Sequence, residues 1–165
     1  MRTLALFLLA VALVTTSASA ASPRAKVLVR VTSVGGVLVD ARGHTLYSYA
    51  ADQGRTPACY GACASLWPPF LTSAKPIAGL GAKAKLLGMT KRKDRKLQVT
   101  YAGHPLYFYS GDAKAGQLKG QGYESSWWAL AASGAKVKKP ATTSTTPPPP
   151  TTTTVPGYGA GNGGY

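Results

Sequence analysis

Two cysteines, Cys59 and Cys63, are the only thiols of the chain, and three residues separate them. Thioredoxin-type sites and haem attachment sites place two residues between their cysteines, so this spacing differs from both. Gly61 lies between the cysteines and permits the tight bend that a short bridge needs. The pair therefore predicts a disulfide that fixes the loop before Trp67, with reversible thiol redox chemistry as the alternative.

Aspartate and histidine recur at matching points of two similar segments, as Asp52 and Asp112 and as His44 and His104. Each aspartate can accept hydrogen bonds from the loop that follows it, and paired catalytic carboxylates are the alternative. Each histidine follows a turn glycine, which favours a role in the turn. A soft copper site of the two histidines with Met89 and the cysteines is the weaker alternative, because tight ligand clusters are absent, and no metal is expected.

The sequence contains no phosphate-binding glycine loop, no nucleophile elbow and no Ser-His-Asp set at a known spacing. We therefore expect a noncatalytic protein without a cofactor.

These residues belong to an internal duplication. Shifted by 60 residues without a gap, the chain matches itself at Val39/Val99, Gly43/Gly103, His44/His104, Leu46/Leu106, Tyr47/Tyr107, Tyr49/Tyr109, Asp52/Asp112, Ser65/Ser125 and Trp67/Trp127. Matches that include Trp, Tyr and His residues are hard to attribute to chance, so the two segments are copies of one unit.

Each copy contains short β-branched or aromatic runs divided by turn residues, which is typical of strands. The first hairpin is expected at residues 27–39 and the second at residues 89–101, and an aromatic strand follows each, at 46–50 and 106–110. Each unit is thus predicted to be a three-stranded meander. Residues 127–132 are expected to form a closing strand, whereas Pro68 and Pro69 argue against central sheet pairing in the first copy.

The predicted fold is mostly β, with two tandem meander repeats of about 60 residues that form one small domain. We place the first repeat at residues 27–82 and the second at 83–135. The only expected helix covers Ala82 to Leu87 and is ended by Gly88.

The aromatic strands place Tyr47 and Tyr49, or Tyr107 and Tyr109, on one face. Core packing is the first interpretation, since aromatic side chains dominate the energetics of cores. The alternative is an aromatic surface that stacks on sugars or on a partner protein. The candidate binding residues under that alternative are Trp67, Trp127, Trp128, Lys91, Arg92 and Lys93.

Both ends of the chain have compositions unlike the repeats. Residues 1–20 show a basic residue, an apolar run and Ala18-Ser19-Ala20, which is the pattern of a cleaved signal peptide. No cysteine lies near the cleavage point, so no lipid anchor is expected. Residues 136–165 are rich in Thr, Pro and Gly and are predicted to be disordered, because they cannot bury enough apolar area to offset the entropy of ordering.

The formal net charge is +14. Outside a cell, this charge favours wall polymers, acidic polysaccharide or other anionic surfaces as partners, although it could serve only solubility. Nucleic acid is not expected as a partner of an exported protein. We expect a monomer.

Tyr47-Ser-Tyr49-Ala-Ala-Asp52 and Tyr107-Phe-Tyr109-Ser-Gly-Asp112 resemble the tandem Yx(FWY)xxD motif of a bacterial family of secreted repeats and lipoproteins of unknown function. The Cys59 to Pro69 and Val99 to Tyr107 segments resemble the same family. The resemblance implies a bacterial extracytoplasmic location and a two-repeat architecture, and it names no substrate.

Together these features predict a secreted, noncatalytic module of the cell envelope that binds a wall polymer, polysaccharide or envelope protein through aromatic and basic surfaces. An extracytoplasmic thiol-redox or copper-handling protein that uses Cys59 and Cys63 is the alternative.

Overall fold

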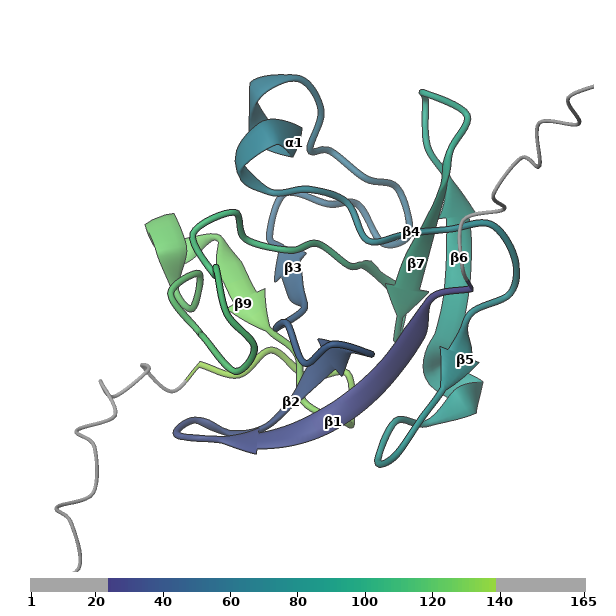
Figure 1. The fold of residues 1–165 in the computed structure, drawn as a ribbon. Coiled ribbons are helices and arrows are strands. Elements are labelled where there is room, and N and C mark those ends of the chain that lie inside the picture. Colours follow the sequence, from purple (N-terminus) through teal and green to yellow (C-terminus); the bar gives the residue numbers. More distant parts are fainter. Residues whose placement is uncertain (1–23, 139–165) are drawn as a thin grey trace, which may run out of the picture.

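The computed structural model describes residues 24–138, which form a mostly β structure (Figure 1). The predicted signal peptide and nearly all of the predicted disordered tail lie outside the described residues. Within residues 24–138, no helix has the length and hydropathy needed to cross a membrane.

The first repeat opens with the hairpin of β1 (Lys26–Thr32) and β2 (Gly35–Asp40), which pair antiparallel from Val27↔Asp40 to Thr32↔Gly35. Gly35 has a φ of 107°, a value that favours glycine and allows the two-residue turn. The chain turns again after Asp40, and the amide of Leu46 donates to the carbonyl of Leu38 at 3.0 Å. The aromatic strand β3 (Tyr47–Tyr49) follows.

The second repeat follows the same path through β6 (Leu87–Lys91), β7 (Leu97–Tyr101) and β8 (His104–Pro105). Its hairpin turn is one residue longer, and its next turn is one residue shorter. The amide of Leu106 therefore donates to the carbonyl of Val99, so Val99 takes the place of Leu38. The predicted match of Val39 with Val99 is therefore wrong. The longer hairpin turn shifts the alignment by one residue within this strand, and the shorter next turn restores it afterwards.

The repeats exchange their C-terminal segments. The closing strand β9 (Trp127–Ala129) of the second repeat pairs with β3 of the first, with Tyr49 opposite Trp127. In return, residues 66–69 of the first repeat lie along residues 107–110, and β4 (Leu71–Thr72) pairs with β7. The amides of Ala50 and Ser110 make equivalent bonds, to the carbonyls of Ser126 and Leu66.

Pro68 and Pro69 do not exclude the first repeat from this exchange, contrary to expectation. Phe108 donates its amide to the carbonyl of Pro68 at 2.8 Å, and Pro69 forms a bridge with Tyr107. Proline lacks the N–H group but keeps the carbonyl acceptor. The segment therefore pairs through its acceptors, although it forms a single isolated bridge where β9 forms a strand.

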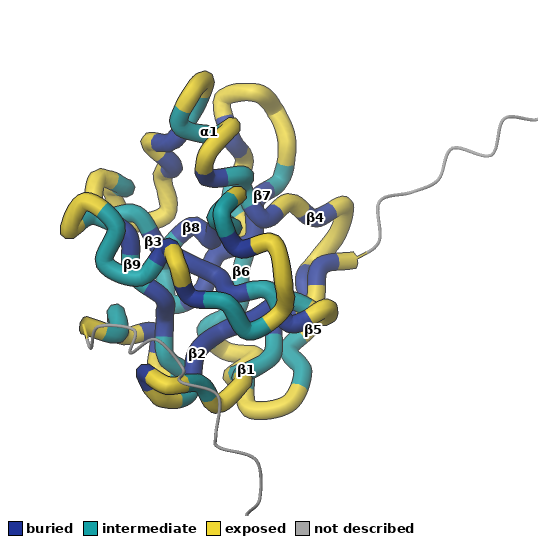
Figure 2. Tube along the Cα trace, turned by 60° about the vertical axis from the view of Figure 1, so that its left-hand side comes forward, coloured by how far each residue is buried: buried dark blue, intermediate teal, exposed yellow. Residues whose placement is uncertain are grey.

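The two repeats meet at Tyr47 and Tyr107, whose amides donate to one another's carbonyls at 2.9 Å in both directions. Around this bridge lie two buried clusters of side chains. One contains Tyr47, Trp67, Tyr107 and Trp127, and the other is mostly aliphatic and contains Leu46 and Leu106. Figure 2 shows that β2, β3, β8 and β9 form the buried centre, while the connecting loops are exposed. Residues of both repeats thus contribute to each of the two clusters.

The helix expected at residues 82–87 does not form as predicted. Residues Ala84–Leu86 form a 3-10 helix of three residues (η1), and Leu87 and Gly88 already belong to β6, opposite Tyr101 and Thr100. Pairing with β7 outweighs the weak helical preference of this short stretch.

A short helix not expected from the sequence, α1 (Ala62–Leu66), includes Cys63 and leads into Trp67. The remaining elements are β5 (Ile77–Ala78), which runs parallel to β1, and η2 (Tyr123–Ser125). β5 and η1 lie at the junction between the repeats in the sequence.

Candidate functional site

The tyrosine and aspartate of the Yx(FWY)xxD motif bond across the two repeats. The hydroxyl of Tyr47 donates to Oδ2 of Asp112 at 2.6 Å, and the hydroxyl of Tyr107 donates to Oδ1 of Asp52 at 3.1 Å. Each carboxylate also accepts a backbone N–H from the loop that follows it, from Ala58 and Lys119. The four motif residues therefore hold the two halves together.

Burial changes the acid-base properties of these groups. It raises the pKa of Asp112 and raises the pKa of Asp52 to about 6. It also raises the pKa values of Tyr47 and Tyr107, so both hydroxyls remain protonated donors. Oδ2 of Asp52 is buried without a hydrogen bond. This carboxylate is therefore less favourable in its ionised form in the folded chain than in water.

We expect the stability of the protein to depend on the protonation of Asp52. The folded pKa of about 6 lies above the ordinary value of 3.8, so the folded state binds the proton more tightly than the unfolded state. The contribution is fully present below pH 3.8 and is lost as the pH rises to about 6. After allowance for partial exposure, the loss amounts to about 1 to 2 kcal/mol.

Urea unfolding of the wild type and of Asp52→Asn between pH 4 and pH 7 measures this loss. The difference between the two proteins isolates Asp52, because His104, whose pKa burial and Lys136 lower, titrates in both. A pH-independent difference would contradict the assigned pKa.

Aromatic rings stack through the centre of the molecule. Trp67 and Trp127 lie parallel with centroids 3.9 Å apart, and Tyr49 and Tyr109 cover their outer faces at 4.1 and 4.5 Å. Both tryptophans are only 2% exposed. Trp67 and Trp127 are therefore core residues and do not form the binding surface considered for them, whereas Trp128 is half-buried.

Cys59 and Cys63 form a disulfide, and Cys59 is wholly buried. The guanidinium of Arg92 donates to the carbonyl of Cys59 at 2.9 Å and to the side chain of Gln98 at 2.6 Å. Arg92 is only 3% exposed, so this candidate binding residue instead anchors the disulfide loop to the second repeat. This Arg92 contact is a further link between the two repeats.

The residues considered for copper are distributed over several elements. His44 lies beside Asp40, His104 is in β8, and Met89 is on β6. Within residues 24–138, no three His, Cys, Asp or Glu side chains lie close enough together to hold a metal ion.

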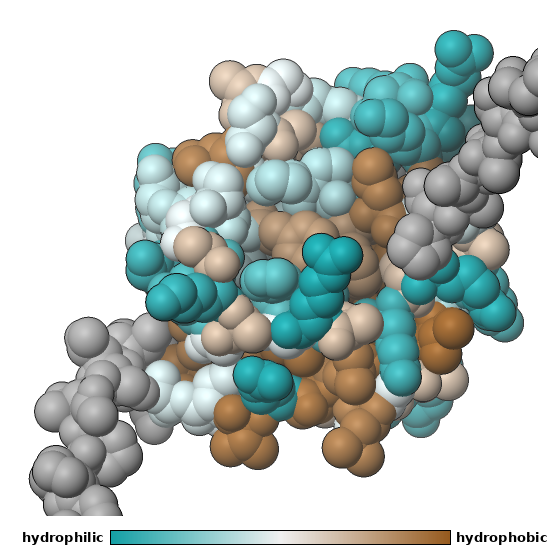
Figure 3. Space-filling model, in the orientation of Figure 1, coloured by the Kyte–Doolittle hydropathy of each residue, from teal (hydrophilic) through white to brown (hydrophobic). Residues whose placement is uncertain are grey.

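Four exposed cations gather at the turn between β6 and β7, namely Lys91, Lys93, Arg95 and Lys96. We call this group the cationic hairpin. The ring of Tyr60 lies beside it, with the guanidinium of Arg92 at 4.3 Å and the ammonium of Lys93 at 5.7 Å from its centroid. A cavity of about 290 Å³ adjoins Tyr60 and Lys93. Figure 3 shows hydrophilic side chains over this turn and hydrophobic ones along the lower edge, near β1.

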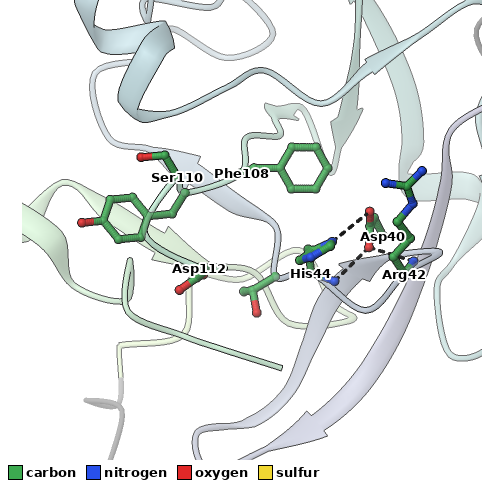
Figure 4. A pocket seen from close by; sticks show the side chains of 8 residues that line it. Asp40, Arg42, His44, Phe108, Ser110 and Asp112 are labelled. Atoms are coloured by element: carbon green, nitrogen blue, oxygen red, sulfur yellow. Dashed lines mark hydrogen bonds and ion pairs between the residues drawn. The ribbon is translucent and has the colours of Figure 1, made fainter. Parts of the chain in front are cut away.

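A second cavity, of about 280 Å³, lies between the repeats (Figure 4). We call it the inter-repeat pocket, and its lining residues are Asp40, Arg42, His44, Thr45, Phe108, Tyr109, Ser110 and Asp112. Sequence reasoning did not single out Arg42, Phe108 or Tyr60. No local pattern marks them, because segments distant in the chain bring them into place.

The sequence was compared with models of protein families. The model of the family Lipoprotein_15, described as a secreted repeat of unknown function, matches residues 29–70 and 88–131, which together are more than half of the chain. The chain belongs to this family. The two matches of this secreted repeat each run from the first hairpin of a copy to just beyond its tryptophan, as the duplication predicted. Comparison with curated proteins and with solved structures finds no match.

Proposed function

We propose that this secreted repeat protein is a noncatalytic module of the bacterial cell envelope that binds an anionic polymer through its cationic hairpin. The excess of exposed cations carries the proposal, since the chain has 19 lysines and arginines against five aspartates and glutamates. A folded protein gains nothing in stability from such self-repulsion, whereas an anionic partner relieves it.

Four of the five acidic residues are used within the fold. Asp52 and Asp112 bond to tyrosines, Asp94 pairs with Arg92, and Asp40 accepts two amides of its own turn. Among the described residues, ion pairs with carboxylates involve only His44 and Arg92. The lysines of the cationic hairpin are therefore free to meet anionic groups of a partner.

The hairpin also has a fixed shape. The hydroxyl of Tyr60 accepts the amide of Lys93 at 3.1 Å, and the disulfide and buried Arg92 hold the neighbouring loop. Cations on a braced turn lose less conformational freedom on binding than cations on a mobile segment would.

The test uses heparin and poly-glutamate as model polyanions, with affinity measured at several salt concentrations. Replacing Lys91, Lys93 and Lys96 together by glutamine should weaken binding about tenfold or more at low salt, with the loss shrinking as salt screens the charges. The matched control replaces Lys75, Lys83 and Lys85, three exposed lysines outside the hairpin, by glutamine. Equal losses in the two variants would show that net charge alone attracts the polymer, and the proposal would be wrong.

A further inference from the structure

The inter-repeat pocket has polar groups that differ in their freedom to bind. Oδ1 of Asp40 accepts the amides of Arg42 and His44 at 2.9 and 2.8 Å, and its Oδ2 faces Nδ1 of His44 at 3.6 Å. Asp112 accepts from Tyr47 and from the amide of Lys119. Both carboxylates are thus occupied by bonds within the fold.

The guanidinium of Arg42 is different, because no side-chain hydrogen bond or ion pair within residues 24–138 holds it. Because Nδ1 of His44 faces Asp40, the other ring nitrogen, Nε2, is available to bond to a ligand. The pocket therefore offers an unpaired cationic donor beside two carboxylates whose oxygens already accept hydrogen bonds within the fold, and the free guanidinium favours a carboxylate in the ligand.

An aromatic wall completes the pocket. The ring of Phe108 meets the ring of His44 edge-on at a centroid distance of 6.4 Å, and it contacts the ring of Phe70 edge-on at 5.1 Å. In Figure 4, the Phe108 ring and the Arg42 guanidinium lie on the same side of the His44–Asp40 pair. A ligand between them would bring an apolar face to the ring and an anionic group to the guanidinium.

We infer that the inter-repeat pocket binds one sugar-acid residue, a pyranose that carries a carboxylate. Arg42 holds the carboxylate in its planar fork, Phe108 packs against the C–H face of the ring, and Nε2 of His44 meets a hydroxyl. A cavity of about 280 Å³ lies at the small end of ligand sites, which suits a single ring. This inference rests on the proposed function, because the anionic polymer named there would be the source of the sugar acid.

The second repeat lacks an equivalent site. Its corresponding turn is one residue shorter and consists of Ala102 and Gly103, so it has no counterpart of Arg42. Ser48 stands where the other copy has Phe108, and its hydroxyl is buried and donates to the carbonyl of Trp128. One site per chain is therefore expected.

The test is an NMR titration of the whole secreted protein with glucuronate, with glucose as the neutral sugar and acetate as the bare carboxylate. Glucuronate should bind at a 1:1 ratio, shift the ring signals of His44 and Phe108, and bind about tenfold more tightly than glucose or acetate. Arg42→Gln should weaken glucuronate binding about tenfold, Arg42→Lys by less, and the control Lys75→Gln should leave it unchanged.

Equal binding of acetate and glucuronate, equal effects of Arg42→Gln and Lys75→Gln, or no shifts at His44 and Phe108 would each overturn the inference. The hairpin variant separates this result from the proposed function. If the lysine substitutions at the hairpin leave polymer binding unchanged while Arg42→Gln weakens glucuronate binding, the hairpin proposal is wrong and the inference about the pocket stands.

Discussion

Neither repeat is expected to fold alone. A fragment of residues 24–82 lacks β9, the partner of β3, and leaves Trp67 without Trp127. A fragment of residues 83–138 lacks β4, the partner of β7, and loses the acceptor of the Tyr107 hydroxyl on Asp52. Each piece would expose half of a shared core, and pieces of this size are already near the lower limit for independent folding.

The two fragments should therefore give NMR spectra with poor dispersion when they are separate and a native spectrum when they are mixed in equal amounts. The control is the uncut chain, which keeps both partners of every exchanged strand and should give the native spectrum. A well-dispersed spectrum of residues 24–82 alone would contradict the exchange of strands.

Replacing Trp127 by alanine should lower the free energy of unfolding by about 4 kcal/mol, because a buried ring is removed from a site that cannot collapse. Trp127 contacts Trp67, Tyr49 and Tyr107 at once, so its loss affects rings from both repeats. Chemical denaturation measures the change.

Trp128 is the matched control, because it has the same side chain one position along β9 but is only half-buried. Trp128→Ala should cost about 1 kcal/mol. The double variant of Trp67 and Trp127 should cost less than the sum of the single changes, since each single change already removes their mutual contact. Similar costs at positions 127 and 128 would mean that the ring stack contributes little.

The sequence by itself determined the repeat, the strands and the disulfide. Alternation and turn residues are local signals, so the hairpins and the aromatic strand of the first copy follow from short stretches of chain. The aromatic strand expected at residues 106–110 was wrong, because this stretch forms only isolated bridges at Tyr107, after the short β8. The spacing of Cys59 and Cys63 likewise fixed the bridge within one loop. The predicted helix at residues 82–87 was wrong, because β6 gains more from pairing with β7 than the stretch gains from turning into a helix.

Only the tertiary structure decided how the copies combine. Two meanders of like sequence can pack side by side or exchange segments, and the local pattern of each is the same in both cases. The exchange buries Trp67 and Trp127 against one another, turns the Tyr and Asp of the motif into bonds between the repeats, and uses Arg92 to anchor a loop 33 residues away. It also brings Arg42 beside Phe108, since contacts between distant segments depend on the packing of the whole chain rather than on any local stretch.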